Sequence, residues 1–365
     1  MDWYTYSQMI MDKCKEREIP YHIGLELTPL CNFDCSMCYV HLSPEEAAKQ
    51  GRMLTTKQWI YLAEEAKKLG AVTMEITGGE AITRTDFPIL YKCFIEMGYL
   101  IVLRTNGYLI KGKILELLKK YKPRAVMITL YGASDETYQK VCGIRDGFSI
   151  VTSNILKLKE AGITVRLSST ITNENMEDVK LMREWADEHG LNFTTGGHLF
   201  TPRPGSNRNV EKLQIRYPDE NYHIPEEMKP VHREIPDREK YMNPFWMCRL
   251  FGAKLSISWD GKMVICNSNP AVRIDPFATS LGEAYHEMYR KLKAIRRPEK
   301  CNDCEYIDLC TVCPSMLYSS TGNMEQTNND MCKYAYRAYK NRILMESQQE
   351  VVDGISAEKC DEGEE

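Results

Sequence analysis

Three cysteines near the start of the chain have the spacing of ligands to one metal centre. Cys31, Cys35 and Cys38 lie in a CxxxCxxC run. A [4Fe–4S] cube has four irons and normally takes four thiolates, so three cysteines on one loop leave one iron without a protein ligand. On spacing alone, a zinc site completed by His22 or His41 is the alternative. An open iron would let this centre bind a small molecule instead of only passing electrons.

Cysteines are also dense in the last third of the chain. The chain holds 14 cysteines, an excess that in a reducing cytosol indicates metal or redox chemistry and not disulfides. A zinc ribbon is the alternative, but zinc sites normally use four or eight ligands, whereas seven fit a set of four and a set of three. These seven are Cys248, Cys266, Cys301, Cys304, Cys310, Cys313 and Cys332. The others, interpreted as buried or inert thiols, are Cys14, Cys93, Cys142 and Cys360.

The elements that position the first cysteines alternate between strand and helix over about residues 20–200. Apolar and polar residues alternate just before Cys31, which predicts a strand that runs into the cysteine loop. Thr55 and Gln58 form a capping box that begins an amphipathic helix, and Gly70 ends it. Further strands are expected at 72–76, 100–104, 125–130, 163–168 and 191–195, and helices at 86–97, 110–120, 148–161 and 174–189.

Six strand–helix units in this order predict a parallel sheet with right-handed crossovers. Six are too few for a closed eight-fold barrel. The predicted fold class is therefore α/β: a partial (β/α)6 barrel of the TIM type, followed by a cysteine-rich domain. Reactive groups gather at the carboxyl ends of the strands in such folds. The cysteine run, the run 77–80, the run 104–107 and the run 129–132 all follow predicted strands.

Composition divides the chain into four segments. We expect an N-terminal helix over 1–19, the barrel over 20–235, a cysteine-rich domain over 236–345 and a disordered acidic tail over 346–365. Residues 202–247 are rich in proline and charge, and are expected to cross the barrel mouth or to act as a linker. For their basic residues, a solvated stretch is favoured over a site for an acidic leader peptide. These residues are Arg203, Arg208, Lys212 and Arg216.

Charge and hydropathy exclude two classes of partner. The formal net charge of −4 gives no attraction to nucleic acid or to an anionic membrane. No stretch approaches the roughly 18 apolar residues of a membrane span, and the N-terminus lacks an apolar signal core. We therefore expect a cytoplasmic protein that binds neither nucleic acid nor membrane.

The early motifs together resemble the radical S-adenosylmethionine (radical SAM) superfamily. The run Thr77-Gly78-Gly79-Glu80 follows the second predicted strand, about 40 residues after the cysteine run. The resemblance implies that the three early cysteines hold a cluster whose open iron binds the amine and carboxylate of S-adenosylmethionine. One electron then cleaves S-adenosylmethionine to a 5′-deoxyadenosyl radical, which takes hydrogen from the substrate. It also implies that Gly78, Gly79 and Glu80 contact the methionine amine.

Other contacts to S-adenosylmethionine follow from the same resemblance. They are those of Tyr39, Asn106, Arg166 and Ser168. Two positions depart from the family pattern. Met37 stands where an aromatic usually packs on adenine, so Tyr39 is expected to substitute, and Ala81 stands where proline commonly follows the glycine motif.

The later cysteines are similar to the SPASM extension of peptide-modifying radical SAM enzymes, which holds two auxiliary [4Fe–4S] clusters and so brings the total to three. The resemblance assigns Cys301, Cys304, Cys310 and Cys332 to the outer cluster, and Cys248, Cys266 and Cys313 to the inner one. Lys254 stands near the place where some relatives have an extra cysteine, so the inner cluster is expected to have an open iron or a non-cysteine ligand. An open iron would bind a substrate thiolate, whereas a closed cluster would only pass electrons.

Auxiliary clusters suggest that an electron leaves the substrate after hydrogen abstraction. We therefore expect an oxygen-sensitive oxidoreductase that matures ribosomally made peptides or proteins by thioether or carbon–carbon crosslinking. The sulfatase-maturing branch has an aspartate base after the cysteine of the GxxxxC motif, but here that position is Asn267, whose amide takes no proton at neutral pH. Formylglycine formation is therefore less favoured than peptide crosslinking.

Alternatives remain open at this stage. They are formylglycine formation, small-molecule cofactor biosynthesis and, from another class, a non-catalytic zinc or electron-transfer protein. The expected electron donor is of the flavodoxin or ferredoxin type. Because only about 20 residues precede the first predicted strand, either a separate protein recruits the peptide or the substrate is small.

Overall fold

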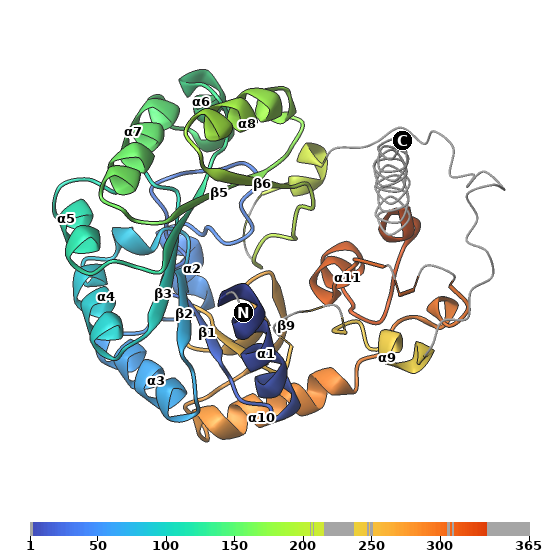
Figure 1. Cartoon of the computed structure of the whole chain (residues 1–365). Coiled ribbons are helices and arrows are strands. Elements are labelled where there is room, and N and C mark those ends of the chain that lie inside the picture. The colour runs from blue at the N-terminus through green and yellow to red at the C-terminus, as the bar shows by residue number, and fades with distance from the viewer. Residues whose placement is uncertain are drawn as a thin grey trace, which may run out of the picture. The chain divides into compact units, whose positions relative to one another are not determined.

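The computed structural model forms two compact units (Figure 1). The first contains residues 1–216 and 250–291, and the second contains 217–249 and 292–365. The structure describes residues 3–204, 206, 208–214, 237–246, 248, 251–304, 307–308 and 310–333. The expected acidic tail, Cys360 and most of the 202–247 segment lie outside the described residues. The predicted boundary between residues 235 and 236 stays a prediction.

A nine-stranded sheet organises the first unit, in the order β6-β5-β4-β3-β2-β1-β7-β8-β9. Its first six strands in the chain are parallel to their neighbours. They are β1 (His22–Glu26), β2 (Thr73–Thr77), β3 (Leu100–Thr105), β4 (Ala125–Thr129), β5 (Val165–Thr170) and β6 (Asn192–Gly196). Six parallel strands in chain order confirm the predicted partial barrel.

The remaining strands continue the sheet beyond β1. Strand β7 (Lys254–Ile257) pairs in parallel with β1, and β8 (Met263–Cys266) and β9 (Asn269–Ile274) follow in antiparallel pairing. The predicted hairpin with Asp260-Gly261 in its turn is therefore present. Gly261 has a φ of 84°, a conformation that favours glycine. We had assigned this hairpin to the later domain, but its first strand covers the edge of β1, which would otherwise be exposed.

The helices of this unit are α1 (Trp3–Glu16), α2 (Pro44–Gln50), α3 (Thr56–Lys68), α4 (Phe87–Glu96), α5 (Lys113–Lys120), α6 (Asp135–Cys142), α7 (Gly147–Glu160) and α8 (Val179–Glu188). Helices α3, α4, α5 and α7 lie along the outer side of the curved sheet (Figure 1). The capping box of Thr55 and Gln58 begins α3 as predicted. The sequence patterns did not predict α6, and they placed the start of α8 too early, where a 3-10 turn lies. None of the described helices is long and apolar enough to span a bilayer.

The second unit is built from short elements. They include α9 (Arg238–Met242), a 3-10 turn (Glu299–Cys301) and α11 (Pro314–Thr321). Helix α10 (Leu281–Lys293) begins in the first unit and ends in the second. Six of the seven later cysteines belong to the second unit, whereas Cys266 ends strand β8 in the first.

Candidate active site

The carboxyl ends of β1, β2 and β3 bring the predicted early motifs together. The cysteine loop follows β1, the glycine motif follows β2 and Asn106 follows β3. The Nδ2 atom of Asn106 lies 3.7 Å from the sulfur of Cys31 and 2.9 Å from the side-chain oxygen of Asn32. The Oε2 atom of Glu80 accepts a hydrogen bond of 2.8 Å from the main-chain amide of Asn106. These loops therefore form one connected site.

Main-chain amides donate hydrogen bonds to two sulfurs of the cysteine loop. The amide of Phe33 lies 3.3 Å from the sulfur of Cys31, and the amide of His41 lies 3.3 Å from the sulfur of Cys38. Donors of this kind favour the thiolate over the thiol. Burial acts in the opposite direction and raises the pKa of both thiols.

The three thiols are neighbours but do not converge on one point. Cys35 and Cys38 lie close enough to Cys31 for their charges to raise its pKa, after the larger effect of burial. Within the described part of the chain, no group of three or more cysteine, histidine, aspartate or glutamate side chains is set to hold a metal ion. Soft sulfur donors that receive amide hydrogen bonds nevertheless fit an iron–sulfur cluster, whose binding requires the thiolates that the amides favour.

The two histidines considered as zinc ligands are engaged elsewhere. His22 begins β1, and its Nδ1 atom lies 2.9 Å from the hydroxyl of Thr73 at the amino ends of the strands. A strand rises about 3.3 Å per residue, which places His22 on the order of 13 Å from the other end of β1. The Nδ1 atom of His41 lies 2.6 Å from the guanidinium of Arg208. The geometry therefore gives no support to a zinc site completed by either histidine.

Gly78 and Gly79 allow the loop after β2 to touch the chain that leads into the cysteines. A Cβ atom at Gly78 would lie 2.6 Å from the carbonyl oxygen of Thr28. One at Gly79 would lie 2.7 Å from the carbonyl carbon of Leu30. The amide of Glu80 donates a hydrogen bond of 2.8 Å to the Leu30 carbonyl oxygen. Only glycine permits this approach.

Glu80 ties the end of β2 to the end of β3. Its side chain is only 1% exposed, and its Oε1 atom accepts a hydrogen bond of 3.1 Å from the amide of Ile82. Its Oε2 atom accepts one of 2.8 Å from the hydroxyl of Thr105, besides the bond from Asn106. Burial raises the pKa of this carboxyl, and these hydrogen bonds oppose that shift. Glu80 thus positions its neighbours, and its contact with the methionine amine stays a prediction.

Arg166 and Ser168 lie on the opposite face of β5 from its buried residues Val165 and Leu167. Arg166 is exposed and Ser168 is half-buried. Ser168 pairs in register with Thr129 at the end of β4, so it faces the same edge as the cysteine loop. The contacts of Arg166 and Ser168 with S-adenosylmethionine stay predictions.

Tyr39 packs edge-to-face on Phe200, with ring centroids 5.7 Å apart. Burial raises the pKa of its hydroxyl. Its carbonyl oxygen accepts a hydrogen bond of 3.0 Å from the amide of Arg203. Met37, where an aromatic was missing, is buried. The packing of Tyr39 on adenine stays a prediction.

Two partners of Cys35 were not predicted from the sequence. Hydrogen bonding to the Cys142 side chain and burial raise the pKa of the Cys35 thiol, and hydrogen bonding to Tyr131 lowers it. Cys142 ends α6 and is fully buried, as its interpretation as a small hydrophobe anticipated. The carbonyl oxygen of Cys142 also accepts a hydrogen bond of 3.0 Å from the amide of Asp34. A helix that sequence patterns did not predict therefore holds the centre of the cysteine loop.

Two of the basic residues expected in a solvated stretch instead fasten the site. Arg203 donates hydrogen bonds of 2.6 Å to the Oε2 atom of Glu26 and of 3.0 Å to the carbonyl oxygen of Asn267. Both partners of this ion pair are buried. A buried carboxylate requires a cation, and Arg203 supplies it to Glu26. Arg208 donates a hydrogen bond of 2.7 Å to the carbonyl oxygen of Cys35 and pairs with Asp34. We had expected both arginines to be solvated, but both are engaged in the site and neither is available to an acidic peptide.

The other two basic residues of this stretch differ from them. Lys212 is exposed, in agreement with a solvated position. Arg216 lies outside the described residues. The correction therefore applies to the two arginines that follow β6 most closely, since these lie beside the cysteine loop.

The second unit brings the predicted outer ligands close to one another. Burial raises the pKa of Cys301, and the charges of Cys304, Cys310 and Cys332 raise it further, whereas that of Arg297 lowers it. The predicted inner ligands are divided between the units. Cys266 ends β8 in the first, and Cys248 and Cys313 belong to the second.

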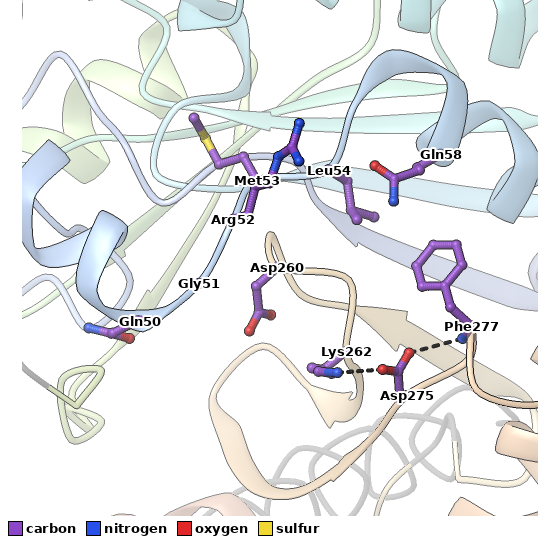
Figure 2. Close-up of a pocket in the computed structure, with 10 residues that line it drawn as sticks. All are labelled: Gln50, Gly51, Arg52, Met53, Leu54, Gln58, Asp260, Lys262, Asp275 and Phe277. Atoms are coloured by element: carbon purple, nitrogen blue, oxygen red, sulfur yellow. Dashed lines mark hydrogen bonds and ion pairs between the residues drawn. The ribbon is translucent and has the colours of Figure 1, made fainter.

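A pocket on the first unit lies apart from all predicted site residues (Figure 2). Its volume is about 460 Å³, and its lining includes Arg52, Met53 and Phe277. Figure 2 shows the Lys262–Asp275 ion pair, 2.6 Å long, on one wall. The lining contains no cysteine, so this pocket is not the cluster site.

Comparisons with known proteins agree with this geometry. Residues 25–186 match the model of the radical SAM superfamily. The chain is 25% identical over 339 residues to the AdoMet-dependent heme synthase of Methanosarcina barkeri, a match that covers 83% of this chain and 94% of that protein. It is 25% identical over 292 residues to the subtilosin biosynthesis protein AlbA of Bacillus subtilis, which covers 76% of this chain and 60% of AlbA.

Solved structures share the fold. Streptococcus suis SuiB bound to S-adenosylmethionine aligns with a TM-score of 0.65 at 18% identity, over 88% of this chain and 80% of SuiB. The anSMEcpe structure with bound AdoMet aligns with a TM-score of 0.60 at 15% identity, over 92% of this chain and 99% of that one.

Fold and site together define an enzyme in which a partial parallel barrel presents a three-cysteine loop at its carboxyl edge. Residues 25–186 form a radical SAM domain. Such a domain implies S-adenosylmethionine and one [4Fe–4S] cluster as cofactors. The predicted family and enzyme class are confirmed, and the alternative of a non-catalytic protein is excluded.

Proposed function

We propose that this enzyme oxidatively crosslinks a peptide or protein, forming a thioether or a carbon–carbon bond. The cluster on Cys31, Cys35 and Cys38 would supply the electron that cleaves S-adenosylmethionine to a 5′-deoxyadenosyl radical. The observation that carries the oxidative part is the four-cysteine set of the second unit, since Cys304, Cys310 and Cys332 all act on the pKa of Cys301. Such a set supports a complete outer auxiliary cluster that accepts an electron.

The peptide substrate is supported by the names of the relatives. AlbA acts in subtilosin biosynthesis, one SuiB structure contains the precursor peptide SuiA, and a PqqA peptide cyclase of Granulibacter bethesdensis is 28% identical over 177 residues. Asn267 favours crosslinking over formylglycine formation, because its amide cannot act as a base. The proposal includes three [4Fe–4S] clusters and an electron donor of the flavodoxin or ferredoxin type. It also includes a separate peptide-recruiting protein and a cytoplasmic location.

A second candidate is the biosynthesis of a small-molecule cofactor. The chain covers 94% of the heme synthase of Methanosarcina barkeri, but only 60% of AlbA. A short cysteine-rich reading frame beside the gene would favour the peptide. A cluster of cofactor-biosynthesis genes would favour the small molecule.

Anaerobic reconstitution tests the proposal. Three cubes predict about twelve irons and as much sulfide per chain, and formation of 5′-deoxyadenosine after reduction. Deuterium in the 5′-deoxyadenosine formed with a fully deuterated candidate peptide would identify that peptide as the hydrogen donor. About four irons per chain would overturn the oxidative part, and zinc without sulfide would overturn the whole proposal.

A further inference from the structure

A buried arginine in the second unit has no role in the site described so far. Arg297 is 5% exposed, and its Nε atom donates a hydrogen bond of 3.1 Å to the carbonyl oxygen of Tyr241. One Nη2 hydrogen bond of 3.1 Å reaches the carbonyl oxygen of Val312, and Nη1 lies 3.5 Å from the sulfur of Cys310. Its own amide donates a bond of 2.7 Å to the carbonyl oxygen of Met242. The guanidinium is therefore fixed with one edge against a cysteine.

The positive charge of Arg297 has no carboxylate partner among the described residues. Arginine remains charged in proteins, and a buried charge without a counter-charge is costly. Its guanidinium instead lies 3.5 Å from the sulfur of Cys310, one of the four proposed outer ligands. Thiolates at these positions would supply the missing counter-charge.

The neighbouring arginine shows that this placement is specific. Arg296 has a side chain that is 54% exposed and pairs with Glu239 at 2.8 Å. Surface ion pairs of this kind contribute little, about 0–1 kcal/mol. Two consecutive residues of the same type thus have opposite environments, and only one of them faces the cysteines.

We propose that Arg297 is a positioning residue for the outer auxiliary cluster. The positive charge of its guanidinium and its N–H···S hydrogen bond to Cys310 make that cluster easier to reduce. The inference rests on the proposed function, which places a cluster on these four cysteines. In the proposed reaction the substrate radical loses one electron, and the substrate loses a proton, as the new bond closes. A cluster held by these cysteines would accept that electron and become more negative by one charge, which a fixed cation would favour. An external one-electron acceptor of the flavodoxin or ferredoxin type would then remove the electron.

The test is the reduction potential of the outer cluster in the full-length chain. A Cys35→Ala, Cys266→Ala background removes the signals of the other two clusters. In this background, Arg297→Met is expected to shift the potential to a more negative value, and Arg297→Lys to keep it near that of the parent. Arg296→Met is the matched control and is expected to leave it unchanged. An EPR-monitored redox titration reports the potential, and iron analysis reports how much cluster is retained.

Each outcome has a consequence. Loss of iron from Arg297→Met but not from Arg297→Lys would also support the proposal, because the retained charge is then what holds the cluster. An unchanged potential in an iron-loaded Arg297→Met protein would overturn it. Equal loss of iron from both variants would overturn it too, since packing and not charge would be responsible. If the background protein bound no iron, the four cysteines would hold no outer cluster. That result would overturn both the proposed function and this inference.

Discussion

The two cysteine loops of this protein are held in place by different parts of the structure. The loop of residues 31–38 follows strand β1, and main-chain amides of Phe33 and His41 donate to its sulfurs. Parallel strands on either side fix the chain that enters it. The sheet therefore positions the first loop, and the side chain of Arg208 adds a further contact to it.

The loop of residues 301–310 belongs to a unit in which the described residues form no strand of the sheet. Arginine side chains hold it instead. Arg238 donates hydrogen bonds of 2.6 Å to the carbonyl oxygen of Asn302 and of 3.1 Å to that of Cys304. Arg297 reaches the sulfur of Cys310. Main-chain amides therefore reach the sulfurs of the first loop, whereas arginine side chains contact the described part of the second.

Removing one ligand from each loop gives the largest expected contrast. Cys35→Ala should abolish 5′-deoxyadenosine formation, because the cleavage of S-adenosylmethionine needs the first cluster. Cys304→Ala should leave part of this cleavage, uncoupled from product, because only the proposed electron acceptor is damaged. Product and 5′-deoxyadenosine are measured together by chromatography. Equal loss of cleavage in both variants would contradict the separation of roles.

The ion pair beside the first loop should give the next largest effect. Arg203→Met leaves Glu26 buried without its cation, which costs about 3–5 kcal/mol of unfolding free energy. Adding Glu26→Gln should recover part of that loss. Lys212→Met, at an exposed position that follows β6 like Arg203, should change stability by no more than about 0.5 kcal/mol. Denaturant unfolding measures all four proteins, and a small cost for Arg203→Met would show that the pair does not hold the loop.

The close approach between the loops after β1 and β2 can be tested at Gly79. Gly79→Ala places a methyl group against the carbonyl of Leu30, so we expect a loss of about 2–3 kcal/mol and weaker retention of iron in the first cluster. Gly197→Ala is the control, because no atom lies within 4 Å of a Cβ there. Thermal unfolding and iron analysis report both effects. Normal iron content in a destabilised Gly79→Ala protein would separate the glycine from the cluster.

The smallest effect is a pH dependence at the amino end of the same sheet. Burial, followed by the charge of Lys254, lowers the pKa of His22 to about 3. The unfolded chain therefore binds a proton below about pH 6.5 that the folded chain does not bind, and stability is lost as the pH falls. Between pH 7 and pH 5 this amounts to about 2 kcal/mol.

The variant His22→Gln should lose less stability than the parent over this pH range. His286→Gln is the matched control, since that side chain is 64% exposed. Unfolding measured at both pH values checks the difference. An identical pH dependence in the parent and His22→Gln would mean that His22 titrates freely.

Local patterns in the sequence were sufficient to predict the parallel sheet and the first cysteine loop. The alternation before Cys31, the capping box at Thr55 and the spacing of the cysteines are features of short segments. Such features persist in the fold because propensity and burial act over a few residues. The strands, helix α3 and the motif order were therefore predictable.

Contacts between distant segments were not predictable. Arg203 and Glu26 are 177 residues apart, and composition alone made the arginine look solvated. Cys142 looked inert until helix α6 placed it against Cys35. The same holds for β7, whose pairing with β1 depends on which segment covers the edge of the sheet. The sequence identified the chemistry of the site, but it did not identify the residues that hold the site in place.

The pairing of β1 with β7 also has a consequence for synthesis on the ribosome. More than two hundred residues separate these hydrogen-bonded strands in the chain. Translation at about 5–20 residues per second therefore leaves β1 without this neighbour for roughly 10–50 s. During that time one edge of β1, the strand that leads into Cys31, is unpaired in the nascent chain. An unpaired strand edge is prone to association with other chains.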